Sequence, residues 1–176
     1  VSVLRADGSP FYVRHVGSQV AGAHTWTWRG KDAAGTVVKS GTYTLRLDTA
    51  ATVSTELLLG QVSHALPIDK VNPTLTKRSS TYSTVYPVND DYRDKTALSV
   101  TVSEPTRSLR TTVYNSSGKA VWSSTVADAP AGPVSATFKG RTASGDRLPS
   151  GTYTYAFRAN DYAGNLTTSS RATTVR

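Results

Sequence analysis

Apolar and polar residues alternate in short runs along most of the chain. Tyr153, Tyr155 and Phe157 share one side of such a run, and Thr152 and Thr154 share the other, which is the two-residue period of a β-strand with one buried face. Gly, Asn, Asp and Pro separate the runs, as turn residues do. No stretch combines a helical apolar period with helix caps, so the pattern predicts an all-β fold.

The second half of the chain repeats the first at a constant offset of 110 residues. Residues 25–47 align without a gap with residues 135–157, and the sequence Ser-Gly-Thr-Tyr-Thr occurs at both 40–44 and 150–154. Because turn glycines and strand alternation are preserved together, we interpret the chain as a tandem duplication of one module.

Each copy reads as short strands separated by turns, and such a series is typical of an Ig-like or fibronectin-III-like β-sandwich. We expect a first module at residues 1–66, a linker at 67–73 and a second module at 74–176. The strands predicted in the second module are Thr74–Ser79, Thr96–Ser103, Leu109–Tyr114, Ala120–Val126, Val134–Lys139, Thr152–Asn160 and Leu166–Val175.

Two tyrosines occupy equivalent positions near the start of a strand in the two copies. Tyr43 and Tyr153 both follow a Gly-Thr pair, as does the tyrosine of a tyrosine corner, whose hydroxyl bonds to upstream backbone. We therefore expect a structural role for both residues rather than a catalytic one.

The first copy is expected to lack its first two strands. In the second copy residues 72–106 precede the strand at Leu109, whereas the matching part of the first copy would lie ahead of Val1. Without those strands Trp28 and its neighbours would be exposed, unless an upstream segment or a separate chain completes the module. A smaller module that closes on its five remaining strands is the alternative.

Several stretches of the two copies share a recognisable pattern, namely Trp28–Gly35, Ser40–Tyr43, Phe138–Gly140, Pro149–Tyr153, Asn160–Asn165 and the Asp-rich Tyr86–Thr96. These stretches resemble the Ig-like domain family of flagellar hook-capping proteins, as found in secreted actinobacterial proteins. The resemblance implies an Ig-like fold, a location outside the cell or at the cell wall, and a role as a spacer, platform or adhesion unit.

Composition excludes several classes of function. The chain has no Cys, which removes disulfides, thiolate catalysis and cysteine-type zinc sites, and no apolar run is long enough to span a bilayer. The formal net charge is +8, but Lys and Arg are scattered, so we expect a solvated basic surface and no nucleic-acid partner. A glycan or an anionic wall polymer remains a candidate ligand.

Catalytic motifs are not found in the sequence. His15, His24 and His64 have no metal-ligand spacing, and no Gly-x-Ser-x-Gly elbow precedes a helix. We therefore expect a non-catalytic structural or interaction module that positions or completes a neighbouring domain. The alternatives are a module that binds carbohydrate or a cell-wall polymer, and the C-terminal part of a cleaved secreted enzyme whose active site lies upstream.

A short acidic segment is the candidate metal site. Asn89, Asp90, Asp91 and Asp94 offer several oxygen ligands of the kind that Ca²⁺ prefers. The competing interpretation, which we favour, is that these side chains cap turns by accepting hydrogen bonds from local backbone amides.

Two aromatic residues are candidates for sugar binding. Trp122 and Tyr12 occupy equivalent positions, each one residue after an apolar residue, Val121 or Phe11. If Val121 and Phe11 face the core, strand alternation turns Trp122 and Tyr12 outward, where an aromatic face could stack on a pyranose ring. The competing interpretation is packing between modules or under a loop.

Overall fold

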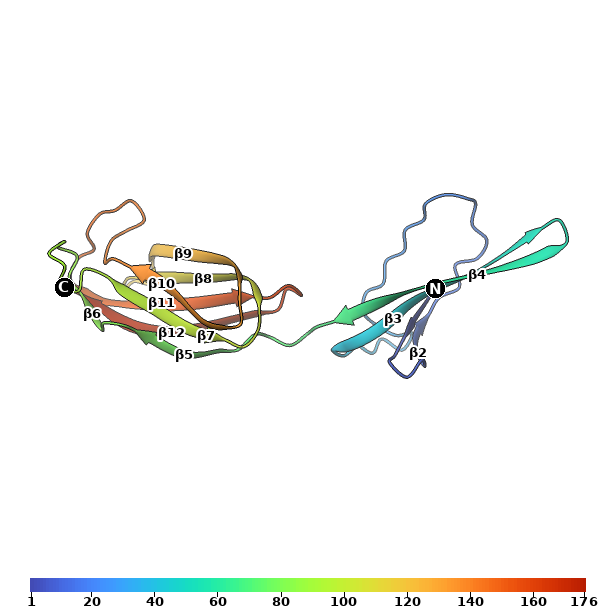
Figure 1. Ribbon diagram of the computed structural model, residues 1–176, viewed down its shortest axis with the longest axis horizontal. Coiled ribbons are helices and arrows are strands. Elements are labelled where there is room, and N and C mark those ends of the chain that lie inside the picture. Colours follow the sequence, from blue (N-terminus) through green and yellow to red (C-terminus); the bar gives the residue numbers. More distant parts are fainter. The chain divides into compact units, whose positions relative to one another are not determined.

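The computed structural model describes residues 1–176, except for the side chains of Val53 and Ala172. The described residues form twelve strands and no helix, which confirms the predicted all-β fold. The chain divides into two compact units, Val1–Lys70 and Val71–Arg176 (Figure 1).

The second unit is a sandwich of two sheets. One sheet has the order β10-β7-β5 and the other the order β6-β12-β11-β8-β9. All pairings are antiparallel except that of β6 with β12. The strands are β5 (Leu75–Ser80), β6 (Thr84–Val85), β7 (Thr96–Val102), β8 (Thr106–Tyr114), β9 (Ala120–Ala129), β10 (Gly132–Phe138), β11 (Gly151–Asn160) and β12 (Leu166–Val175).

The core of the second unit lies between its two sheets. Leu98 and Phe138 of one sheet and Val113, Tyr155 and Phe157 of the other are all 0% exposed. They belong to one contiguous apolar cluster, as the alternation in these strands predicts. Burial of such aromatic side chains is the main stabilising contribution in a small sandwich.

The predicted tyrosine corner is present in this unit. Tyr153 donates a hydrogen bond of 2.8 Å from its hydroxyl to the Pro149 carbonyl, which ties the start of β11 to the preceding loop. Burial raises the pKa of Tyr153, so this hydroxyl stays protonated and keeps its donor role.

The first unit contains a single four-stranded sheet. Its strands are β1 (Ser2–Leu4), β2 (Pro10–Val13), β3 (Gly41–Val53) and β4 (Glu56–Ile68), in the order β2-β1-β3-β4. By the repeat, this order matches β9-β8-β11-β12 of the second unit. The described residues of the first unit therefore provide one sheet of the sandwich and no counterpart of the other.

The missing sheet explains why residues 14–40 contain no strand. Residues 22–28 are the counterparts of β10, which in the second unit pairs along its whole length with β7. Without a β7, residues 22–28 have no neighbouring strand. The first unit thus forms four strands rather than the five that the sequence suggested for a module closing by itself.

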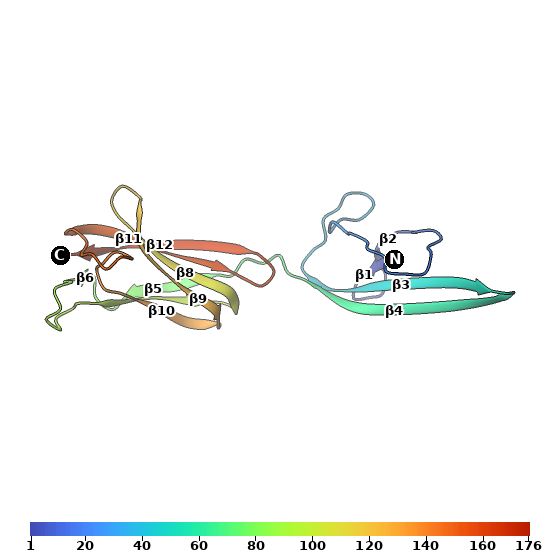
Figure 2. The ribbon, with the colours of Figure 1, turned by 90° about the horizontal axis from the view of Figure 1, so that it is seen from above.

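β3 and β4 form a long hairpin. β3 continues to Val53 and the chain turns through Ser54, which has a positive φ of 59°. The far half of the hairpin extends past β1, which pairs with β3 only at residues 44–46 (Figure 2). At its other end β4 includes Pro67 and Ile68, so the linker expected at 67–73 starts two residues later.

Candidate functional site

One face of the first unit carries a cluster of aromatic side chains. Phe11 packs edge-on against Trp28 and Tyr43, with ring centroids 6.0 and 5.7 Å apart. Tyr12 stacks on Trp26 at 5.9 Å. All five rings are half-buried, so the rings shield one another from solvent only in part. We call these five residues the aromatic face.

A β-bulge places two consecutive residues of β2 on this face. Val3 pairs with Tyr12 but Leu4 pairs with Pro10, so Phe11 is an extra residue in its strand. Directly opposite residues share one side of a sheet, and Val3 is fully buried. Tyr12 therefore points to the inner side, and Phe11 also packs there because the bulge re-aims it.

A turn that is common to both units holds Trp28. The Val38 amide donates to the Gly30 carbonyl at 2.8 Å, and the Trp28 indole donates to the Lys31 carbonyl at 2.8 Å. By contrast, the Trp26 indole nitrogen is buried and has no hydrogen-bond partner among the described residues. A buried donor without an acceptor is unfavourable, so the Trp26 side of the aromatic face lacks a stabilising hydrogen bond among the described residues.

The aromatic face continues into exposed aliphatic side chains of the hairpin. Leu47 is 44% exposed, whereas its counterpart Phe157 in the second unit is fully buried. Val62 lies directly opposite Leu47 and is 68% exposed, and Leu58, two pairs further out on the same side, is 49% exposed. Such a continuous apolar surface is typical of a protein interface.

Two carboxylates of the first unit are held by neighbouring polar groups, whereas the Arg5 guanidinium lies over the Phe11 ring of the aromatic face, 5.2 Å from its centroid. A hydrogen bond from Gln61 and the nearby guanidinium of Arg46 lower the pKa of Asp48, and hydrogen bonds from Ser9 lower the pKa of Asp7. These carboxylates therefore stay ionised and solvated. Partly exposed aromatic rings are enriched at binding interfaces.

The predicted outward orientation of Trp122 and Tyr12 is wrong. Trp122 lies opposite the buried Val113 and packs on Phe138 at 5.4 Å, as Tyr12 packs on Trp26. In both units the bulge lets two consecutive residues face inward, Phe11 with Tyr12 and Val121 with Trp122, which sequence alternation cannot reveal. Their role in sugar binding stays a prediction, now without the exposed rings that suggested it.

The acidic segment uses its side chains for local hydrogen bonds. Both carboxylate oxygens of Asp94 accept backbone amides, from Asn89 at 2.9 Å and from Asp91 at 2.8 Å, and Asp90 accepts the Tyr92 amide at 3.0 Å. In the described part of the chain, Asp90, Asp91 and Asp94 do not bring three carboxylate oxygens within 4.8 Å of one another. This geometry supports turn capping, and calcium binding stays a prediction.

Histidine-based chemistry has no support in the described residues. His15, His24 and His64 are exposed and belong to no cluster of three potential metal ligands. His24 instead approaches the Val20 carbonyl at 2.7 Å. None of the described segments is a helix of the length and apolarity needed to cross a membrane.

Sequence reasoning missed the aliphatic half of the face. Leu58 and Val62 were not identified because no strand was predicted for the segment that forms β4. The signal that could have found them is the run of apolar residues at 57–59 together with the two-residue period of β4.

Known proteins similar to the chain were found at two levels. A family model described as the FlgD Ig-like domain matches residues 1–52 and 84–162. No curated protein matches the chain. The match therefore includes β1, β2 and nearly all of β3 in the first unit, but not β4, and most of the second unit.

Solved structures with a similar backbone include two bacterial proteins. FlgD from P. aeruginosa aligns with 58% of this chain and 73% of its own length, at 20% identity and a TM-score of 0.43. Dimeric latent PorU from Porphyromonas gingivalis aligns with 79% of this chain but 12% of its own length, at 18% identity and a TM-score of 0.45. Neither alignment bears on function at this level of similarity.

Proposed function

The chain belongs to the FlgD Ig-like domain family, and on that premise we propose that it is a non-catalytic interaction module whose first unit accepts two β-strands from a neighbouring domain. The observation that carries this proposal is the uncovered inner face of the first unit. The same face of the second unit is covered by the sheet β10-β7-β5. The repeat therefore indicates what kind of partner the first unit lacks.

The second unit also suggests the register of the accepted strands. In it β10 pairs with β7 from Gly132–Val102 to Phe138–Thr96. Applied at the repeat offset, this pairing puts one donated strand antiparallel to residues 22–28. Those residues would then gain a ladder of backbone hydrogen bonds, which is how strand addition gives affinity.

The chemistry of the donor follows from β7. Its residues alternate between buried and half-buried, and Leu98, Val100 and Val102 are at most 1% exposed. A donor with the same alternation would insert apolar side chains over the rings of Trp26 and Trp28. Because residues 103–105 connect β7 to β8, and β8 matches β1, the donated strand would end close to Val1.

We also propose that the parent protein acts outside the cell or at the cell wall. This part of the proposal has the support of the basic net charge of +8, which favours attraction to anionic surfaces. Proteomic analysis of culture medium, cell wall and cytosol from the source bacterium tests it, and recovery in the cytosol alone would contradict it.

Strand acceptance can be tested by completing the first unit artificially. A copy of residues 72–110 is placed directly before Val1, in a Trp122→Phe background so that fluorescence reports Trp26 and Trp28. We expect a blue shift of the emission, protection of residues 14–40 from proteolysis, and a more cooperative unfolding transition, because the rings leave water.

The matched control carries the same extension with the copies of Leu98, Val100 and Val102 replaced by Asp. It has the same length and turns, but its inward residues cannot be buried at low cost. An unshifted emission with the intact extension, or equal protection with both extensions, would contradict the proposal.

A further inference from the structure

Two arginines lie side by side on the outer face of the five-stranded sheet in the second unit. Arg110 of β8 and Arg158 of β11 are a directly opposite cross-strand pair, and both are exposed. Like charges in this position destabilise a sheet. The guanidinium of Arg158 has no hydrogen-bond or ionic partner among the described residues, so the pair lacks a counter-charge within the unit.

The arginine pair stands between two hollows of about 430 and 400 Å³. Both hollows are lined by Arg110, Arg158 and Leu166. One continues along the strands to Ser108 and the other to residues 112 and 156, so together they form a groove on the sheet. None of the described residues that line the groove is acidic.

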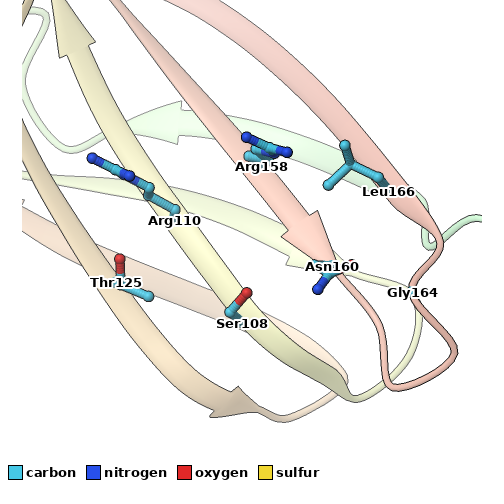
Figure 3. A pocket seen from close by; sticks show the side chains of 7 residues that line it. All are labelled: Ser108, Arg110, Thr125, Arg158, Asn160, Gly164 and Leu166. Carbon is cyan, nitrogen blue, oxygen red and sulfur yellow. The ribbon is translucent and has the colours of Figure 1, made fainter.

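Neutral polar side chains lie along the same strands as the two arginines, and Leu166 lies beside Arg158 (Figure 3). Thr125 is directly opposite Arg110, and Asn160 is directly opposite Ser108. Arg110 donates one hydrogen bond of 3.2 Å to the Ser123 hydroxyl, which orients its side chain and leaves further N–H groups free. The groove therefore offers two positive charges, of which that of Arg110 is oriented by a hydrogen bond, beside hydroxyl and amide groups.

We propose that the Arg110–Arg158 groove binds the carboxylate or phosphate groups of an anionic polysaccharide. A guanidinium presents a planar fork of donors that matches either oxyanion, and an oxyanion between the two arginines removes their mutual repulsion. The neighbouring Ser, Thr and Asn side chains can both donate to and accept from sugar hydroxyls. The open groove along the strands fits an extended chain.

The lining favours a saccharide over the other polyanions. Single-stranded nucleic acids are held by aromatic platforms on which successive bases stack, whereas the described lining of the whole groove contains one aromatic side chain, the half-buried Tyr114. Peptide recognition uses apolar pockets or an open sheet edge, whereas this groove lies on the face of paired strands and Leu166 is its one large aliphatic side chain among the described residues. The inference is independent of strand acceptance by the first unit.

Calorimetric titration of the full chain with defined polymers tests the proposal. The probes are oligogalacturonate, which carries carboxylates, phosphorylated dextran, neutral dextran and oligothymidylate. We expect at least one anionic saccharide to bind, more weakly at high salt because exposed charges are screened, and neutral dextran not to bind. The anionic probe that gives heat identifies the acid group.

Four variants separate this site from general basic charge. Arg110→Gln and Arg158→Gln should each weaken binding by about ten- to a hundredfold, as expected for loss of a charged hydrogen bond. Arg110→Lys should also weaken binding because it keeps the charge but loses the fork. Arg107→Gln removes an exposed arginine of the same strand that lines neither hollow, and should change affinity by less than about twofold.

The Gln variants should melt at or above the wild-type temperature, because each relieves a like-charge pair, so lost binding is not lost folding. Three results would overturn the proposal. They are absence of binding to both anionic saccharides, equal or tighter binding of oligothymidylate, and an equal loss of affinity in Arg107→Gln.

Discussion

In the second unit Phe157 of β11 is fully buried beneath β7 and β10, whereas its counterpart Leu47 in β3 is 44% exposed. The two residues stand at the same place in sheets with the same strand order. What differs is the second sheet, whose strands β5 and β7 have no counterpart in the first unit. Strand order within one sheet thus persists without the partner sheet, while burial does not.

The turns before β3 and β11, by contrast, have the same hydrogen bonds in the two units. The Val38 amide donates to Gly30 at 2.8 Å, and the Leu148 amide donates to Gly140 at 3.0 Å. An isolated bridge joins Lys31 to Val37 in one unit, and its equivalent joins the matching residues in the other. Turn geometry is therefore set within a few residues, whereas a strand at 22–28 requires a distant partner.

Truncation of the matched core aromatics should give the largest contrast between the units. Phe138→Ala should destabilise the second unit by about 3–5 kcal/mol, because it leaves a cavity. Trp28→Ala should destabilise the first by only about 1–2 kcal/mol, because the ring is half exposed and less surface returns to water. Amide hydrogen exchange in β11 and β3 measures the two effects separately, and equal losses would mean that both cores are closed.

Alanine at the paired turn glycines should give a smaller contrast. Gly30 and Gly140 have φ values of 69° and 63°, so either substitution is strained by about 1–2 kcal/mol. A methyl group at Gly140 would also meet Pro87 at 3.2 Å, which adds about 1–3 kcal/mol of overpacking. The nearest atom at Gly30 belongs to Val38, at 3.5 Å. Thermal melting of both variants checks this, and a larger effect at Gly30 would contradict it.

The loss of stability in acid should differ between the two units by the smallest amount, because a single turn of the second unit causes the difference. Burial raises the pKa of Asp161, but hydrogen bonds from Asn165 and from nearby backbone amides outweigh this effect, so the pKa lies below its usual value. Asp161 accepts the Asn165 backbone and side-chain N–H groups, both at 2.8 Å. The repeat offset puts Ala51 at this position in the first unit, which cannot do the same.

Because the folded-state pKa of Asp161 lies below the unfolded value of about 3.9, its stabilisation is fully present above that pH. It is lost as the pH falls through the folded-state pKa. Stability of the second unit should therefore decline below about pH 4, and Asp161→Asn should flatten this decline. Hydrogen exchange of β11 between pH 3 and 6 checks it, and an unchanged slope in the variant would contradict the role of Asp161.

Much of the fold could be predicted because its determinants are local. The alternation at Tyr153 to Phe157 and the repeated turn glycines are visible in the sequence, and both lead to the observed sheets. The orientation of Trp122 could not be predicted, since one extra residue in β9 reverses the alternation without any compositional sign. Exposure of Leu47 was equally hidden, because it depends on a sheet that other residues would have to supply.

The length of the β3–β4 hairpin has a consequence for how the protein behaves in solution. Leu57 and Leu59 lie near its tip, 62% and 77% exposed, where β3 and β4 pair with each other beyond the reach of β1. Exposed apolar strands of this kind readily associate with strands of another copy of the chain. The purified full chain should therefore oligomerise and precipitate at lower concentrations than a chain that consists of the second unit alone. A ligand that covers the hairpin should raise the concentration at which this occurs.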